Sequence, residues 1–332
     1  MFIFLFFDNN YIGDILNKLY LIKNPDVFQG ENKLKSNYKS NYFEGWYFKN
    51  VGEDINISFI PSISINNGKQ SCFIQVITQN SSYVIPYDIR FFSFSYSPFY
   101  IQIGNNYFSK DLIHIDISSK DINILGDLIY TDSTYLKKKL LYPNIMGPFS
   151  YIPFMECNHA ILDMKHTIYG SLLINDTIYD FNNGSGYIEK DWGISFPSSY
   201  VWGQGNSFEK EDNASIFVSV ANIPLSSFHF TGFICVFYLN GKEYKFTSYN
   251  GAKIEKYEIN NNNINIILKK HNTKIYINSN HISSNELLAP KLGNMNTSVF
   301  ESLNSFLNIV LIENNNIIFN DISSNCGLEI VI

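Results

Sequence analysis

Charged side chains are scarce in this sequence of 332 residues. They make up 16% of the chain, against about 25% in an average globular protein. The formal net charge is −6. Because a protein that binds nucleic-acid phosphates needs a basic footprint, this charge balance argues against a nucleic-acid partner.

Cysteine is scarce as well, and the four cysteines form no CxxC pair: Cys72, Cys157, Cys235 and Cys326. Their wide spacing favours free, buried thiols in a reducing compartment, so we expect a cytoplasmic protein. The sequence also has no Walker loop, nucleophile elbow, HExxH or GxGxxG. With none of these motifs present, we expect chemistry without a cofactor.

Long apolar runs are missing too. The run at residues 1–7 is too short to span a bilayer and has no basic segment before it. Helical spacing follows it, at Ile12, Ile15, Leu16, Leu19 and Ile22, and this spacing predicts a short amphipathic helix. The helix either packs across a barrel mouth or joins Phe2–Phe7 in a weak contact with a membrane surface. Basic residues are few for an interfacial anchor, so we expect at most peripheral membrane contact.

From Tyr42 onward, short apolar runs alternate with polar residues and are separated by turn signals such as Asn66-Asn67-Gly68. Many short strands with almost no helix predict an all-β protein, although periodicity alone does not distinguish a barrel from a sandwich. A basic stretch with proline and glycine interrupts the pattern and predicts a break between Leu136 and Pro153. We therefore expect an N-terminal extension with the helix (1–23), a first β domain (24–148) and a second β domain (149–332).

Two segments concentrate tryptophan and carboxylate side chains. One is Tyr42–Lys49, with Glu44 and Trp46, and the other is Gly186–Gly193, followed by Trp202-x-Gln204-x-Asn206. Residues i and i+2 of a strand share a face. The alternation therefore predicts that Glu189 and Asp191 point the same way, and that Trp202, Gln204 and Asn206 also share a face.

These two segments resemble the tocopherol cyclase family, most nearly its bacterial branch of unassigned substrate. Further matching stretches are spread from Asn24 to the C-terminus and include Asn24–Gly30, Gly147–Phe149, Pro153–His159 and Tyr249–Ala252. The resemblance implies two tandem lipocalin-like antiparallel β-barrels. It also implies a reaction in which an acid protonates a prenyl double bond and a phenol oxygen attacks the resulting cation. Related lipocalin-like enzymes hydrate carotenoid double bonds through the same protonation.

Three carboxyl groups are candidates for the acid: Asp191, Glu189 and Glu44. A carboxyl group beside indole rings is poorly solvated, which raises its pKa and lets it donate a proton at neutral pH. The alternative is structural, with Lys49 or Lys190 pairing with these acids. The plant enzymes of the family have Asn where this chain has Asp191, which leaves the role of Asp191 open.

The candidate ligand-binding residues are aromatic or polar. Aromatic faces attract a cation, and amides can hold a ring oxygen or a water. We expect binding roles for Trp46, Tyr47, Gln75, His159, Trp192, Trp202, Gln204 and Asn206. His159 is alternatively a hydrogen-bonded strand histidine, or a metal ligand with Glu156 and Cys157, but it lacks neighbours at ligand spacing and we expect no metal.

The sequence therefore predicts a cofactor-independent enzyme of the cyclase or hydratase type, in the isomerase or lyase class. Its substrate is expected to be an apolar small molecule, for example one that carries a prenyl chain. The alternative is a non-catalytic carrier that uses the same barrels to hold a lipid or a quinone.

Overall fold

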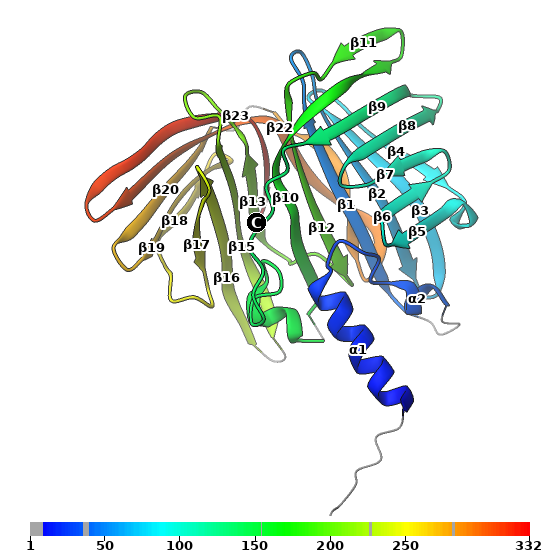
Figure 1. Cartoon of the computed structure of the whole chain (residues 1–332), viewed down its shortest axis with the longest axis horizontal. Coiled ribbons are helices and arrows are strands. Elements are labelled where there is room, and N and C mark those ends of the chain that lie inside the picture. The colour runs from blue at the N-terminus through cyan, green and yellow to red at the C-terminus, as the bar shows by residue number, and fades with distance from the viewer. Residues whose placement is uncertain (1–8, 36–39, 154, 226–227, 281–282) are drawn as a thin grey trace, which may run out of the picture.

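The structure is a computed structural model that describes residues 9–35, 40–153, 155–225, 228–280 and 283–332 (Figure 1). The apolar run at residues 1–7 lies outside the described residues. The predicted amphipathic helix is confirmed as α1 (Asn9–Lys23), and a second short helix, α2 (Glu31–Lys35), follows it. Among the described residues, neither helix is long and apolar enough to cross a membrane. Figure 1 shows α1 extending away from the strands.

The first sheet has twelve antiparallel strands, in the order β4-β3-β2-β1-β12-β10-β9-β8-β7-β6-β5, with β11 paired to β10. A 3₁₀ turn, η1 (Ile89–Phe91), lies between its fourth and fifth strands. The strands are β1 (Tyr42–Val51), β2 (Asn56–Asn66), β3 (Lys69–Thr78), β4 (Ser82–Tyr87), β5 (Phe92–Tyr96), β6 (Phe99–Ile103), β7 (Asn106–Phe108), β8 (Leu112–Ser118), β9 (Asn123–Thr131), β10 (Cys157–Ile174), β11 (Thr177–Asp180) and β12 (Gly184–Gly193).

The second sheet has eleven strands, in the order β17-β16-β15-β13-β23-β22-β20-β19-β18, with β14 paired to β23 and β21 paired to β22. The strands are β13 (Tyr200–Gly205), β14 (Ser207–Phe208), β15 (Ala214–Leu225), β16 (Phe228–Leu239), β17 (Lys242–Thr247), β18 (Lys253–Asn260), β19 (Asn263–Lys270), β20 (Thr273–Asn280), β21 (Asn285–Lys291), β22 (Asn294–Glu313) and β23 (Asn316–Val331).

The two sheets form tandem lipocalin-like β-barrels, which confirms the predicted fold class. Alternating strand residues fill each barrel with its own apolar core, and a third cluster of buried side chains includes Tyr47 and Tyr187 from the first sheet and Trp202 and Phe217 from the second. This third cluster lies where the barrels meet, so the interface between the barrels is packed with buried side chains.

The sheets do not divide at the predicted boundary after residue 148. Strands β10 to β12 belong to the first sheet, because β12 pairs with β1 along Phe43–Val51 and β10 pairs with both β12 and β9. The segment between Leu136 and Pro153, with the 3₁₀ turn η2 (Gly147–Tyr151), is an excursion from the first barrel. The division between the sheets falls between Gly193 and Tyr200, and this corrects the prediction.

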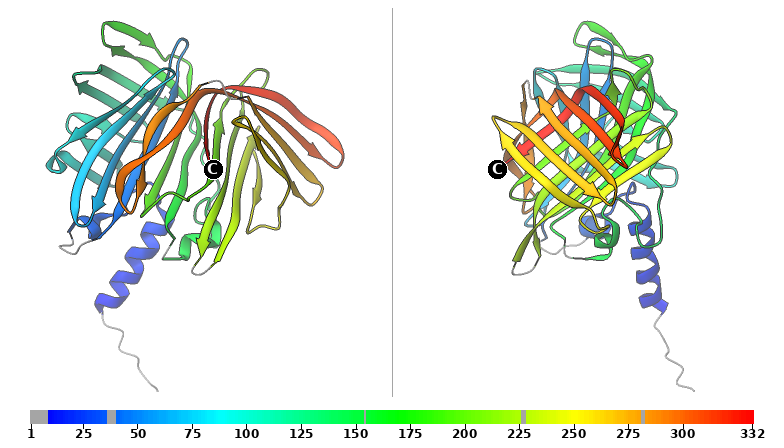
Figure 2. Two further views of the ribbon diagram at one scale, coloured as in Figure 1. Left: turned by 180° about the vertical axis from the view of Figure 1, so that it is seen from behind. Right: turned by 90° about the vertical axis from the view of Figure 1, so that its left-hand side faces the viewer.

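The hairpin of β21 and β22 joins the barrels by crossing from the second to the first. The Gln75 amide donates to the backbone carbonyl of Leu288 (3.0 Å) and accepts from its N–H (3.0 Å). The Asn285 amide also donates to the carbonyl of Thr78 (2.9 Å). Figure 2 shows this hairpin, in orange, beside the blue and cyan strands of the first barrel. The crossing fixes the relative position of the two walls that enclose the site.

Candidate functional site

A cavity of ≈ 190 Å³ lies between the barrels. The walls are mostly apolar, and both sheets contribute to them, with side chains such as Phe43, Ile60, Phe196, Phe233, Leu287 and Val299. One region of the wall is polar instead and carries histidine and several carboxyl groups. The cavity is therefore suited to an apolar molecule with its reactive part at the polar region.

Strands β10 and β12 build the first half of this polar region. His159 and Asp191 are cross-strand neighbours, and the His159 Nδ1–H donates to Asp191 Oδ1 over 2.9 Å. The imidazole stacks on Phe217 from the second barrel, with ring centroids 4.8 Å apart and planes at 15°. Burial lowers the pKa of His159, but the carboxylates of Asp191 and Glu189 outweigh this effect and raise it overall. The geometry fixes the tautomer and aims Nε2 toward Glu189.

Glu189 occupies the same face of β12, which confirms the predicted alternation with Asp191. Its Oε2 accepts hydrogen bonds from the Tyr187 hydroxyl (2.6 Å) and the Trp202 indole N–H (3.1 Å), and it lies 3.7 Å from His159 Nε2. Burial, with a smaller contribution from the charge of Asp191, raises the pKa of Glu189 to about 7. This carboxyl is therefore partly protonated at neutral pH, as a general acid requires.

Two further glutamates line the cavity from the second barrel. Glu301 and Glu329 are cross-strand neighbours on β22 and β23. Glu301 accepts a hydrogen bond from the Tyr47 hydroxyl, and Glu329 accepts one from the Tyr200 hydroxyl (2.6 Å). Burial and then the charge of Glu329 raise the pKa of Glu301 well above its usual range, and burial raises the pKa of Glu329 to about 7. Two carboxyls this close hold one proton between them more readily than two charges.

Glu301 and Glu329 were not among the residues predicted from the sequence. A weak signal was present, because each is the single charged residue of an apolar strand segment, Val299–Leu303 and Gly327–Val331. What makes the two residues a pair is their register across β22 and β23, and sequence spacing does not show that register.

Within the described residues, His159, Glu189 and Asp191 form a group that could hold a metal ion, since one ligand atom from each lies within 4.8 Å of the others. Imidazole and carboxylate ligands suit zinc and other divalent cations. Asp191 already accepts the Nδ1–H of His159, so a cation would use Nε2 of His159 and the carboxylate of Glu189. The expectation that the site works without a metal stays a prediction.

Glu44 was predicted as a catalytic acid, and the structure corrects this prediction. Its carboxylate is fully buried, and Oε1 lies 2.5 Å from Lys190 Nζ. The same carboxylate accepts from the N–H groups of Gln29 (2.8 Å) and Gly30 (3.0 Å) and from the Tyr42 hydroxyl (2.6 Å). With these contacts Glu44 has a structural role, because it ties residues 29 and 30 and Lys190 together, although it also adds atoms to the cavity wall.

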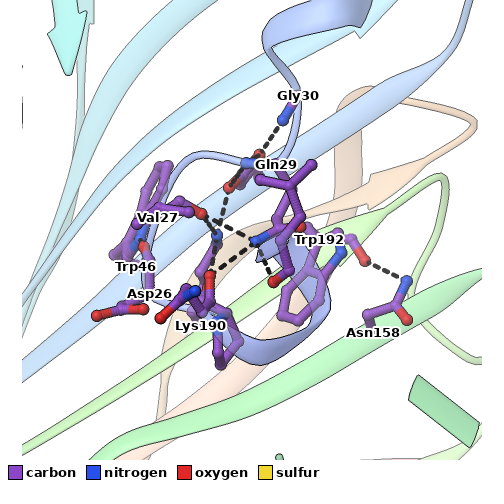
Figure 3. Close-up of polar contacts among 12 residues, drawn as sticks. Asp26, Val27, Gln29, Gly30, Trp46, Asn158, Lys190 and Trp192 are labelled. Carbon is purple, nitrogen blue, oxygen red and sulfur yellow. Dashed lines mark hydrogen bonds and ion pairs between the residues drawn. The ribbon is translucent and has the colours of Figure 1, made fainter. Parts of the chain in front are cut away.

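Lys190 completes this structural group on the barrel side of β12. Its ammonium donates to the carbonyl of Pro25 (2.8 Å) and to that of Val27 (2.6 Å). Figure 3 shows Lys190 beside Val27. The Trp46 indole N–H donates to the carbonyl of Asp26 (2.9 Å). Together with Glu44, these contacts hold residues 24–30 against the first barrel, where Val27 and Phe28 are buried in its core.

Trp46 and Trp192 were predicted to face the ligand, and neither lines the cavity. Lys190 Nζ lies 4.7 Å from the ring centroid of Trp46 and 4.9 Å from that of Trp192, inside the first barrel (Figure 3). The two clusters do meet, because β1 pairs with β12, but alternation turns these indoles away from Glu189 and Asp191. Tyr47 and Trp202 do line the cavity, with ring centroids 5.6 Å apart.

The three amides predicted to bind ligand are engaged with protein groups. Gln75 lines the cavity but holds the backbone of β21. Gln204 accepts from the buried ammonium of Lys49 (2.8 Å), and the Asn206 amide donates to the carbonyl of Gly186 (2.7 Å). Neither Gln204 nor Asn206 lines the cavity. Their shared face therefore joins the barrels instead of contacting a ligand.

Close packing at Trp202 depends on a glycine in β23. A Cβ atom at Gly327 would lie 2.5 Å from the Trp202 ring, which is closer than side chains approach each other. Gly327 therefore leaves the room that lets the indole reach Glu189.

The fold and this site define a class of protein with two lipocalin-like barrels and a buried acid at an apolar cavity between them. A family model described as tocopherol cyclase-like matches residues 134–331, which is more than half of the chain. The chain therefore belongs to the tocopherol cyclase-like family, as the sequence resemblance indicated. A search of curated proteins found no match.

Two solved structures illustrate the likeness of the fold. The crystal structure of CghA with Sch210972 superposes with a TM-score of 0.55 at 8% identity, covering 88% of this chain and 89% of that one. A candidate AttH, NE1406 from Nitrosomonas europaea, gives a TM-score of 0.51 at 10% identity, covering 87% and 93%. At these identities the likeness concerns the fold alone.

Proposed function

We propose that the protein catalyses an acid-initiated cyclisation or hydration of an alkene in an apolar, prenylated small molecule. The observation that carries the proposal is Glu189, a buried carboxyl with a pKa raised to about 7 that lines an apolar cavity beside the His159–Asp191 pair. Membership of the tocopherol cyclase-like family supports the same type of chemistry.

In the proposed step, the protonated Glu189 carboxyl transfers its proton to one carbon of the double bond. The two π electrons form the new C–H bond, and the neighbouring carbon becomes a cation. A hydroxyl oxygen of the same molecule, or a water molecule, then forms the C–O bond and releases its proton. His159 Nε2 lies 3.7 Å from Glu189 Oε2 and can return that proton to the carboxylate. Attack by the internal hydroxyl gives a net isomerisation of the substrate. Attack by water gives a net addition of one water molecule.

The walls of the cavity suit the cation. Tyr47, Trp202 and Phe217 present aromatic rings at the polar region of the cavity, and aromatic faces attract positive charge. Apolar side chains elsewhere in the wall keep bulk water away from the intermediate. In this proposal Asp191 positions His159 and maintains its basicity, while Glu189 is the group that touches the substrate.

The carboxyl pair of Glu301 and Glu329 extends the acidic region of the cavity into the second barrel. In the proposal these groups bind the polar end of the substrate, because a shared proton lets the pair both donate and accept hydrogen bonds. The solved CghA structure, which has the same fold, contains Sch210972, and this supports the proposal of a small-molecule ligand.

A direct test uses protein purified from its own host and examined by native mass spectrometry for a bound small molecule. Incubation with a geranylated hydroquinone, followed by mass spectrometry of the product, then distinguishes cyclisation at constant mass from hydration with the gain of one water. Glu189→Gln, which keeps the shape and removes the acid, should lose turnover and keep the ligand. Retention without turnover by the unaltered protein would instead favour the carrier of a lipid or quinone.

The proposed absence of a cofactor is tested separately. Metal analysis of the purified protein, and turnover before and after dialysis against a chelator, should show no bound divalent cation and no change in rate. A stoichiometric metal lost together with activity would assign His159, Glu189 and Asp191 to a metal site instead.

A further inference from the structure

A second pocket, of ≈ 720 Å³, lies outside the cavity described above and has a different chemistry. Its lining includes six lysines, from a chain with only 24 lysines and arginines in all: Lys137, Lys138, Lys139, Lys242, Lys245 and Lys270. The acidic residue in the same lining is Glu243. This concentration of positive charge stands out in a protein whose net charge is −6.

The lysines reach the pocket from segments far apart in the sequence. Lys137–Lys139 belong to the excursion between β9 and β10, Lys242 and Lys245 lie on β17, and Lys270 ends β19. As a sequence run, Lys137–Lys139 is typical of a solvated loop. The tertiary structure instead sets it opposite the lysines of the second barrel, so the charges converge on one hollow.

Most of these ammonium groups lack an acidic partner. Lys245 pairs with Glu243 (2.6 Å) and Lys242 with Glu313 (3.0 Å). No carboxylate among the described residues lies within ion-pair distance of the other four lysines: Lys137, Lys138, Lys139 and Lys270. Burial lowers the pKa of Lys138, although the charge of Asp26 opposes this, and burial with the charge of Lys245 lowers the pKa of Lys270. The cluster therefore carries unbalanced positive charge that an anion would relieve.

The inner wall of the pocket is partly apolar. Leu136, Ile145 and Ile161 line it, and the rings of Tyr142 and Tyr249 lie 5.6 Å apart beside them. The volume falls within the range of small-molecule sites. A ligand for this pocket would combine a strongly charged anionic group at the lysines with an uncharged part against this wall.

We propose that this pocket binds a phosphate or diphosphate group. Four lysines without a carboxylate at ion-pair distance call for an anion with more than one charge, and ammonium groups bind phosphate oxygens as point charges. A hollow lined by one sign of charge also concentrates counter-ions from solution, even when the protein as a whole repels them. The bearer of the group is either a soluble phosphorylated compound or the headgroup of a phospholipid.

The test is calorimetric titration of the full chain with inorganic pyrophosphate at low ionic strength. We expect saturable binding, weakened about tenfold or more in the Lys138→Gln/Lys270→Gln double variant, because two charge-assisted contacts are removed. The matched control is Lys69→Gln/Lys120→Gln, which changes the net charge equally at lysines outside the pocket. It should bind like the unaltered protein. Absence of saturable binding, or equal weakening in both variants, would overturn the proposal.

A second arm identifies the source of the phosphate group. The same proteins are sedimented with phosphatidylcholine vesicles with and without phosphatidic acid. Binding that needs phosphatidic acid, is displaced by pyrophosphate and is lost in the double variant assigns the pocket to a lipid headgroup. Pyrophosphate binding without any vesicle binding assigns it to a soluble phosphorylated compound.

Discussion

Strands β1 and β12 carry charged side chains on both faces, and the two faces have opposite character. Inside the first barrel, Glu44 and Lys190 form an ion pair in which every donor and acceptor is used to hold residues 24–30. On the other face, Glu189 and Asp191 line a cavity beside His159, and His159 Nε2 has no hydrogen-bond partner among the described residues. Neighbouring charged residues of β12 therefore have different roles. Those that face the interior of the first barrel stabilise the fold, and those that face the cavity are available for chemistry.

The comparison shows how to separate structural from functional carboxyl groups. The Glu44 carboxylate is buried with an ammonium group and several N–H donors, and all of these contacts serve to fix the chain. Burial without an ammonium partner, with the charge of Asp191 nearby, instead raises the pKa of Glu189 and favours its protonated form. Four predictions test this distinction, from the largest expected effect to the smallest.

Glu44→Gln should destabilise the fold by about 3–5 kcal/mol, because it leaves the buried ammonium of Lys190 without a counter-charge. Urea unfolding monitored by circular dichroism gives the free energy of unfolding. Glu189→Gln is the matched control on the other face of the strand pair, and its unfolding free energy should not fall. Equal losses in the two variants would contradict the comparison.

Asp191→Asn should lower turnover by about 10²–10⁴-fold and leave the fold intact, since the amide keeps the shape of the side chain but no longer supports His159 as a base. Steady-state rates with the substrate identified above, together with far-UV circular dichroism, measure both properties. An Asp191→Asn protein that unfolds would mark this carboxylate as structural, like Glu44.

The pH dependence of stability should carry the signature of Glu189. Its folded-state pKa, about 7, lies above its ordinary value of 4.5, so its protonated form is favoured in the folded protein. The stability that it contributes is fully present below about 4.5 and is lost as the pH rises through about 7. Turnover that needs the protonated acid should fall over the same upper range.

Thermal midpoints measured from pH 4 to pH 8 test this linkage. Glu329 shifts in the same direction as Glu189, so Glu189→Gln should reduce the decline and not remove it. A decline of unchanged size in the variant would show that Glu189 does not retain its proton in the folded protein.

Removing α1 should have the smallest effect. A chain that begins at Lys23 should stay soluble with unchanged far-UV circular dichroism, because Leu16, Leu19 and Tyr20 of the helix are exposed. A chain that begins at Glu31 is the informative comparison, since it also lacks the segment bound by Glu44 and Lys190 and should unfold more readily. Aggregation of the longer of these two chains would show that α1 covers core surface.

Much of the fold could be predicted from local sequence. Alternation identified the β structure, helical spacing identified α1, and motif resemblance identified the barrels and the family. The domain boundary could not be placed in the same way, because the strand pattern of β10 and β12 does not specify which sheet they join. Their pairing with β1 and β9 decides that they complete the first barrel.

The site shows the same division between local pattern and tertiary structure. The period of a strand is a local property, so the sequence by itself determined that Glu189 and Asp191 share a face. Which face of a strand meets the second barrel depends on how the sheets curl and pack. As a result of that packing, Glu44, Trp46 and Trp192 lie inside the first barrel. Only the tertiary structure brought Glu301 and Glu329 to Glu189, because strands more than a hundred residues away supply them and long-range pairing leaves no spacing in the sequence.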